Sequence, residues 1–194
     1  MSRPAISQGF PPRPENWANA EQQKEVYARF GLAAYHAQVF EHGVANLLLI
    51  AELVKAKGIV RTQQAWETLV DHVLDSSFQL TLGNMVRRLF EAITLDAAAK
   101  DMINAAKRNR DELCHRFFRE HAEDFMTSAG RLRMLDRIET LGSEICAATA
   151  AMELIEGATA KLIGISPEKT AEYAEAYRRK VTETDSEPGE VGTD

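Results

Sequence analysis

The sequence predicts an all-α fold, a bundle of five to six helices that includes two long ones. Apolar residues recur every three or four positions through most of the chain, as on one face of a helix. Glycine and proline are scarce, at 11 and 6 of 194 residues, and they gather at the ends and a few junctions. No strand-like alternation between turn residues and no long internal repeat is present. The hydrophobic content of 45% is enough for one core.

Three regions differ in composition. Residues 1–19 contain four of the six prolines and predict an extended N-terminal arm, with Phe10 and Trp17 as candidate anchors. Residues 20–181 form the predicted helical domain. Residues 182–194 contain five acidic residues and no basic one, which predicts a disordered acidic tail. The net charge is −6, so the rest of the chain carries −1, which excludes coating of nucleic acid by bulk positive charge.

The first two predicted helices are separated by a glycine. From residue 20 to about residue 57, apolar residues recur on one helical face without a proline. Gly58 suits the position just after a helix end. A second helix is predicted over residues 62–75, and Ser76 and Ser77 are expected to end it.

Three further helices follow. A short helix is predicted over residues 81–93. Thr94 then suits the N-cap of a fourth helix that continues to about residue 126. The fifth helix is predicted over residues 129–163, and Gly164 ends it.

The last predicted helix begins at an N-cap serine followed by proline. Ser166 and Pro167 suit the N-cap and first helical positions of a short helix through about Val181. Helices of about 35 residues are long for a monomer of this size. We therefore expect a second copy to cover part of their surface, as in a homodimer.

Cysteine use and the chain start predict a cytoplasmic protein without a membrane segment. Cys114 and Cys146 lie in apolar helical sequence without metal-binding spacing, which predicts reduced, partly buried thiols. The first residues lack the apolar stretch of a signal peptide. The longest fully apolar run, residues 47–51, is far too short to span a bilayer.

The densest charged segment, residues 107–119, lies in the fourth predicted helix and contains five bases, two acids and one histidine. Two arginine–histidine spacings occur in it. Arg110 precedes His115 with four residues between them, and Arg108 precedes it with six. This resembles the Arg-x(4 to 6)-His signature of the HEPN superfamily (higher eukaryotes and prokaryotes nucleotide-binding), in which a polar residue usually follows the arginine.

Neighbouring residues extend the resemblance. Leu113 and the aromatic pair Phe117 and Phe118 are similar to superfamily members that carry an RN-x-L-x-H-x-F-F type of segment. Asn109 follows Arg108 as in that pattern, whereas Asp111 follows Arg110 where asparagine is commoner.

The resemblance implies a compact helical bundle, often a homodimer in which two Arg/His sets line a shared cleft. Active members are metal-independent endoribonucleases, frequently of toxin–antitoxin or antiviral systems, and other members only bind nucleotides or proteins. The implied partners are RNA, a second copy, and a cognate antitoxin or another protein. No cofactor and no metal are implied.

The residue types suit this chemistry. Histidine titrates near neutral pH and can move a proton of the ribose 2′-hydroxyl or the leaving oxygen, which assigns acid/base catalysis to His115. A planar, permanently charged arginine can clamp the phosphate, which assigns that role to Arg110. Asp111 is the third candidate catalytic residue. The candidate substrate-binding residues are Arg108, Asn109 and Arg119.

Ideal helix geometry leaves the partner of His115 open. Arg110 is about 140° from His115 around the helix, so we expect no pairing of the two within one regular helix. Either of two arrangements would bring an arginine and a histidine together: a dimer that joins the arginine of one copy to the histidine of the other, or a distorted helix. Arg108 is better aligned but about 10 Å away along the axis. Both arginines remain candidates.

Other interpretations use the same residues. A charged helical face is usually a solvated surface with pairs four residues apart. Glu112 and His115 form the Glu-x-x-His half of a di-iron site, but no other histidine has a glutamate three residues before it, so no metal site is expected. The alternative function is a non-catalytic helical module, or regulatory subunit, that dimerises or docks a partner.

Two further groups are polar or basic. One is a polar strip on the first predicted helix, which could face the same cleft. The other is a set of arginines that could extend an RNA-binding surface. The strip comprises Tyr35, Gln38, Glu41, His42 and Asn46, and the arginines are Arg87, Arg88, Arg131, Arg133 and Arg137.

Overall fold

The computed structural model describes residues 10–13 and 18–164, together with five isolated positions between 166 and 179. Within this part of the chain every named element is a helix, and the all-α prediction with two long helices is confirmed. The elements are α1 (Asn19–Ala56), α2 (Gln63–Phe78), α3 (Leu82–Ala92), α4 (Ala97–His115), α5 (Phe117–Glu120), α6 (Ala122–Phe125) and α7 (Ser128–Lys161).

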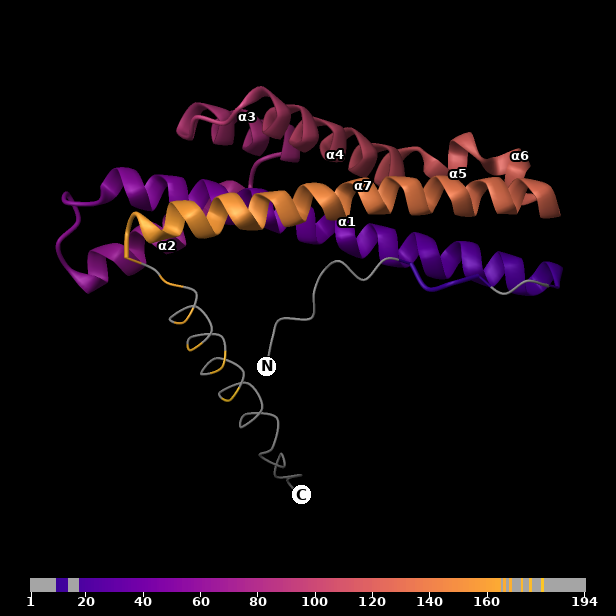
Figure 1. The fold of residues 1–194 in the computed structure, drawn as a ribbon, viewed down its shortest axis with the longest axis horizontal. Coiled ribbons are helices and arrows are strands. Elements are labelled where there is room, and N and C mark those ends of the chain that lie inside the picture. Colours follow the sequence, from indigo (N-terminus) through magenta and orange to yellow (C-terminus); the bar gives the residue numbers. More distant parts are fainter. Residues whose placement is uncertain are drawn as a thin grey trace, which may run out of the picture.

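The two long helices, α1 and α7, lie side by side and run in the same direction (Figure 1). Side-chain contacts join them in order along both helices: Gln22 with Ser128, Arg29 with Glu139, and Lys57 with the Leu162 carbonyl. Gly43 allows close approach, because a Cβ there would lie 3.1 Å from the Met152 methyl carbon. The centre of the core is the seam between these helices.

A second layer, α3 to α6, covers one side of the α1/α7 pair (Figure 1). Its buried side chains join the same core, among them Met85, Leu89, Ile103 and Leu113. α2 folds back beside the end of α1, and only two of its residues, Val73 and Ser77, are buried. Among the candidate residues of α4, Arg110 stands at the boundary between the second layer and α1, where it pairs with Glu41.

The predicted end of α2 at Ser76 and Ser77 is wrong. Both serine hydroxyls donate to the Val73 carbonyl, at 3.0 and 2.6 Å, and the helix continues to Phe78. A serine that bonds back to the preceding turn can be accommodated inside a helix.

The fourth helix is shorter than predicted at both ends. Asp96, not Thr94, is the N-cap, and its carboxylate accepts from the Ala99 N–H at 2.7 Å. The helix ends at His115, because Arg116 has φ −132° and leaves the helical region. This turn places the Phe117 ring in the core, where 1% of the residue is exposed.

Two predicted helix ends are confirmed. Gly58 and Gly164 have φ of +89° and +78°, a conformation that favours glycine and terminates helices. Cys114 and Cys146 are both free cysteines, as predicted. The predicted partial burial is confirmed for Cys146 and wrong for Cys114, which is exposed.

Residues 10–13 lie along the α1/α7 seam. Phe10 packs over Gly142, where an added Cβ would lie 2.7 Å from the ring. Arg13 pairs with Asp136 at 2.8 Å and Glu139 at 2.9 Å. Phe10 thus contacts the body as expected. The other proposed anchor Trp17, most of the helix predicted through Val181, and the predicted acidic tail lie outside the described residues.

Among the described helices, α1 alone is long and apolar enough, by length and composition, to cross a membrane. The core helix of a globular protein passes the same test. Val44, Leu47 and Leu48 of α1 are fully buried against other helices. This helix therefore has the packing of a core element.

Candidate functional site

Arg110 and His115 meet within one chain. Arg110 Nη1 lies 3.1 Å from His115 Nε2, so the expectation that a single helix keeps them apart is wrong. The long arginine side chain bridges the angular separation, and His115 is the last residue of α4, before the backbone changes direction at Arg116. The structure brings Arg110, rather than Arg108, to the histidine.

Two carboxylates also hold the Arg110 guanidinium. Nη2 donates to Glu41 Oε2 at 3.0 Å, and Nη1 donates to Asp111 Oδ1 at 3.2 Å. An arginine has five N–H donors. The contacts with described residues use three of them, which leaves two for a ligand. The Arg110 side chain is 20% exposed, so a ligand can reach it from solvent.

The contact also determines which ring nitrogen of His115 carries the proton of the neutral imidazole. A guanidinium has no acceptor, so His115 Nε2 accepts from Arg110 and the imidazole proton is on Nδ1 in this contact. His115 is exposed, and its Nε2 is therefore a lone-pair acceptor beside a fixed positive charge.

Electrostatics keep Arg110 and Asp111 charged. Burial lowers the pKa of Arg110, but the Glu41 carboxylate outweighs this, and the pKa lies above its ordinary value. Burial raises the pKa of Asp111, but hydrogen bonds and charge from Lys107 and Arg110 bring it below its ordinary value. Lys107 Nζ reaches Asp111 Oδ2 at 2.8 Å.

These side chains line a surface hollow of about 760 Å³ where α1, α3 and α4 meet. The hollow is open, so it can admit a segment of a polymer as well as a small molecule. Its polar lining combines α1, the start of α3 and one face of α4: Glu41, Thr81, Gly83, Lys107, Arg110, Asp111, His115 and Arg116.

The other candidate residues of the motif lie away from this hollow. Asn109 Nδ2 donates to Glu144 Oε2 on α7 at 2.6 Å. Arg108 and Arg119 are exposed and are not among the residues that line the hollow. The structure therefore does not bring Arg108, Asn109 or Arg119 to the Arg110–His115 pair.

In the Glu-x-x-His half-site, the glutamate is bonded to a different helix. Glu112 accepts two hydrogen bonds from Arg137 on α7, at 2.7 and 2.5 Å, so its carboxylate is engaged by that arginine. In the described part of the chain, no three His, Cys, Asp or Glu side chains are placed to hold a metal ion.

The polar strip of α1 divides between two places. Glu41 reaches the Arg110 guanidinium, as the expectation of a shared cleft requires. His42 and Asn46 line a separate hollow of about 200 Å³ between α1 and α7. Tyr35 and Gln38 are exposed.

Most of the additional arginines are paired with neighbours. Arg131 is 3% exposed and bonds Asn19, Gln22 and the Phe125 carbonyl, so it is no part of an RNA-binding surface. Arg87, Arg133 and Arg137 pair with Glu91, Asp124 and Glu112.

Sequence reasoning missed Lys107 and the start of α3 as parts of the hollow. The four-residue spacing of Lys107 and Asp111 on one helix is a signal that could have identified the lysine. No local pattern places Thr81 or Gly83 beside α4, because that depends on how α3 folds back onto the layer.

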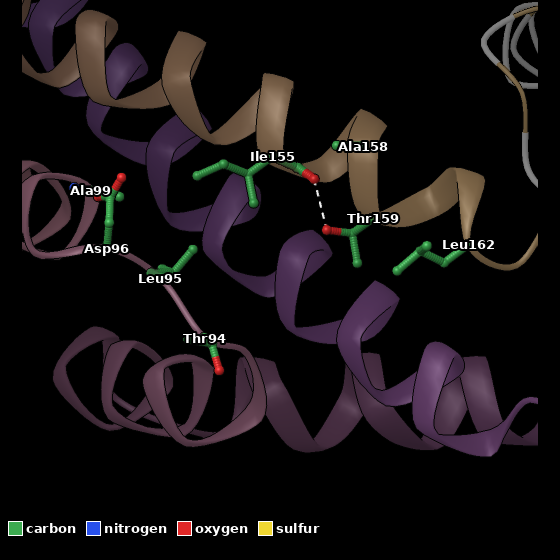
Figure 2. A pocket seen from close by; sticks show the side chains of 8 residues that line it. All are labelled: Thr94, Leu95, Asp96, Ala99, Ile155, Ala158, Thr159 and Leu162. Carbon is green, nitrogen blue, oxygen red and sulfur yellow. Dashed lines mark hydrogen bonds between the residues drawn. The ribbon is translucent and has the colours of Figure 1, made fainter.

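A third hollow, of about 390 Å³, lies between the start of α4 and the end of α7 (Figure 2). Its polar side chains serve the helices themselves. Asp96 caps α4, and the Thr159 hydroxyl donates to the Ile155 carbonyl at 2.8 Å. This hollow therefore offers no set of side chains for chemistry.

No protein-family model, curated protein or solved structure matches this chain. The resemblance to the HEPN superfamily rests on the motif, and the function has to be argued from the residues in the hollow.

Proposed function

We propose that this protein is a HEPN-like, metal-independent endoribonuclease whose site is the Arg110–His115 pair. The observation that supports the proposal is the 3.1 Å contact between Arg110 Nη1 and His115 Nε2 at an open hollow. A proton acceptor and a phosphate-binding cation are the two groups that transesterification of RNA needs. Asp111 supports the pair by holding Arg110.

The proposed reaction uses the substrate's own nucleophile. The Arg110 guanidinium binds the scissile phosphate and its Nη1 releases His115 Nε2, which then takes the proton from the adjacent ribose 2′-hydroxyl. The 2′-oxygen forms a bond to phosphorus as the bond from phosphorus to the 5′-oxygen breaks. The 5′-oxygen takes a proton from water. The products are a 2′,3′-cyclic phosphate and a 5′-hydroxyl, and His115 returns its proton to solvent.

The other parts of the proposal concern partners. Arg108, Asn109 and Arg119 would contact RNA around the site. The protein would act in the cytoplasm, where RNA is present. A cognate antitoxin would control the nuclease activity. The pair forms within one chain, so a homodimer is not required to assemble it. A dimer would instead carry two complete pairs.

The test is cleavage of labelled RNA by the purified protein in EDTA, with analysis of the cut ends. We expect cyclic-phosphate ends, and a loss of about 100- to 10,000-fold in rate for His115→Ala. His72→Ala is the matched control, because His72 is an exposed histidine of α2, and it should cleave like the wild type.

Two results would contradict the nuclease proposal. If the folded wild-type protein cleaves no RNA, or His115→Ala cleaves as fast as the wild type, the nuclease proposal is wrong. The function then falls to the alternative, a non-catalytic helical interaction module.

A further inference from the structure

Three aromatic rings form a patch where α1 meets α5 and α6. The Tyr27 ring centroid lies 5.8 Å from Phe118 and 5.4 Å from Phe125, and the two phenylalanine rings are 6.3 Å apart. Tyr27 is 56% exposed, while both phenylalanines are half-buried beneath it. An exposed ring that is held from behind by two others is a rigid flat surface facing solvent.

This patch and the Arg110–His115 pair lie along the same edge of α1. Tyr27 and Glu41 are separated by about 40° around the helix and about 21 Å along it. On the other side of the edge, Arg110 pairs with Glu41 and Phe118 packs on Tyr27. The edge of α1 against α4 and α5 thus connects the two places.

Three residues on this edge, between the patch and the pair, are small or exposed. Gly31 has open space around it, since an added Cβ would meet no described atom within 4 Å. Gln38 and Cys114 are exposed. Arg116 lines the hollow and Arg119 follows Phe118 in sequence, and both are exposed cations. The result is a strip with a phosphate-binding group at one end and an aromatic face at the other.

We propose that Tyr27, supported by Phe118 and Phe125, is a base-stacking subsite for single-stranded RNA bound at Arg110 and His115. The inference rests on the proposed function and names its substrate class, an unpaired strand. Bases of single strands stack on aromatic side chains, and this stacking tolerates any base because every base has a π-face. A span of about 21 Å holds at most about six nucleotides at the 3.4 Å rise of a stacked strand.

The experiment compares a dinucleotide with a decanucleotide, both 2′-O-methylated so that the nucleophile is blocked, in a fluorescence anisotropy titration at low salt. The decanucleotide can reach from Arg110 to Tyr27, and the dinucleotide cannot. We expect Tyr27→Ala to weaken decanucleotide binding at least about fivefold and to leave dinucleotide binding within about twofold. Tyr27→Trp should retain decanucleotide binding.

Tyr35→Ala is the matched control. Tyr35 is also an exposed tyrosine of α1, at 60%, but lies about 80° further around the helix from the α4 edge. It should bind both oligonucleotides like the wild type. Far-ultraviolet circular dichroism of each variant checks that the helices remain.

The outcomes separate this inference from the proposed function. If Arg110→Ala weakens binding but Tyr27→Ala does not, or if Tyr27→Ala and Tyr35→Ala weaken it equally, the stacking subsite is wrong and the Arg110 site stands. If neither oligonucleotide binds, or Arg110→Ala binds both like the wild type, the proposed function fails and the subsite fails with it.

Discussion

Arg131 and Arg110 are both long basic side chains on core-forming helices, yet the structure uses them in different ways. Arg131 is 3% exposed, and its three hydrogen bonds go to neutral acceptors on Asn19, Gln22 and Phe125. Arg110 is 20% exposed and is held by two carboxylates and a histidine. Arg131 joins α1, α6 and α7, whereas Arg110 faces an open hollow.

The difference shows what makes an arginine available for ligand binding. A buried guanidinium enclosed by protein acceptors stabilises the fold, and no ligand can replace those acceptors without unfolding. A partly exposed guanidinium at an open hollow can exchange a carboxylate for a phosphate. Both arginines have two donors left by their printed contacts, so exposure and the charge of the partners distinguish the two roles, and the sequence contains neither.

The largest expected effect is on stability at Arg131. Arg131→Ala removes a buried side chain that bonds the buried Gln22 and joins it to Asn19 and the Phe125 carbonyl, so we expect a loss of about 2–4 kcal/mol in the free energy of unfolding. Arg110→Ala should lose less than about 1 kcal/mol, because its partners can turn to water. Urea denaturation followed by circular dichroism measures both. Equal losses would contradict the assignment of separate roles.

The fold was more predictable than the site for a physical reason. Helical periodicity and helix-ending residues such as Gly58 and Gly164 are local, so they are visible in the sequence. The break after His115 depends on Phe117 entering a core formed by distant helices. Ideal helix geometry separates Arg110 from His115 because it describes backbone positions and not the reach of a long side chain.

A second prediction concerns the shape of the Arg110 side chain. Arg110→Lys keeps the charge but loses the planar set of donors that binds Glu41, Asp111 and His115 together. We expect RNA cleavage to fall about 10- to 100-fold while stability changes by less than about 0.5 kcal/mol. Initial rates in EDTA and urea denaturation provide the two values. A lysine variant as active as the wild type would show that charge alone suffices.

The Glu112–Arg137 pair gives a prediction for acid stability away from the hollow. The hydrogen bond from Arg137 brings the pKa of Glu112 below its ordinary value. The pair therefore adds stability above about pH 4.3, the unfolded pKa of a glutamate, and this is lost as pH falls through the folded pKa. Since Arg137 is 42% exposed, the contribution is less than about 1 kcal/mol.

Glu112→Gln tests this sign. It should lose less stability than the wild type between about pH 5 and about pH 3, measured by thermal unfolding in matched buffers. The profile of RNA cleavage against pH should keep its shape, because Glu112 is engaged by Arg137 on α7. A steeper acid loss in the variant would reverse the assigned sign.

The smallest expected effect is at Glu41. Glu41→Gln keeps an oxygen acceptor for Arg110 Nη2 but removes a negative charge that competes with phosphate. We expect the 2′-O-methylated decanucleotide to bind about two- to fivefold more tightly, with stability unchanged within about 0.5 kcal/mol. Weaker binding by this variant would mean that the Glu41 charge positions Arg110 rather than competing with the ligand.

The most direct test of the central claim, that Arg110 and His115 act as one site, is a double-mutant cycle on RNA cleavage in EDTA. The wild type, Arg110→Ala, His115→Ala and the double variant are compared under single-turnover conditions. Groups that act as a unit give strongly non-additive losses. We expect the double variant to cleave at a rate within about threefold of the slower single variant. Losses that multiply across the two positions would contradict it.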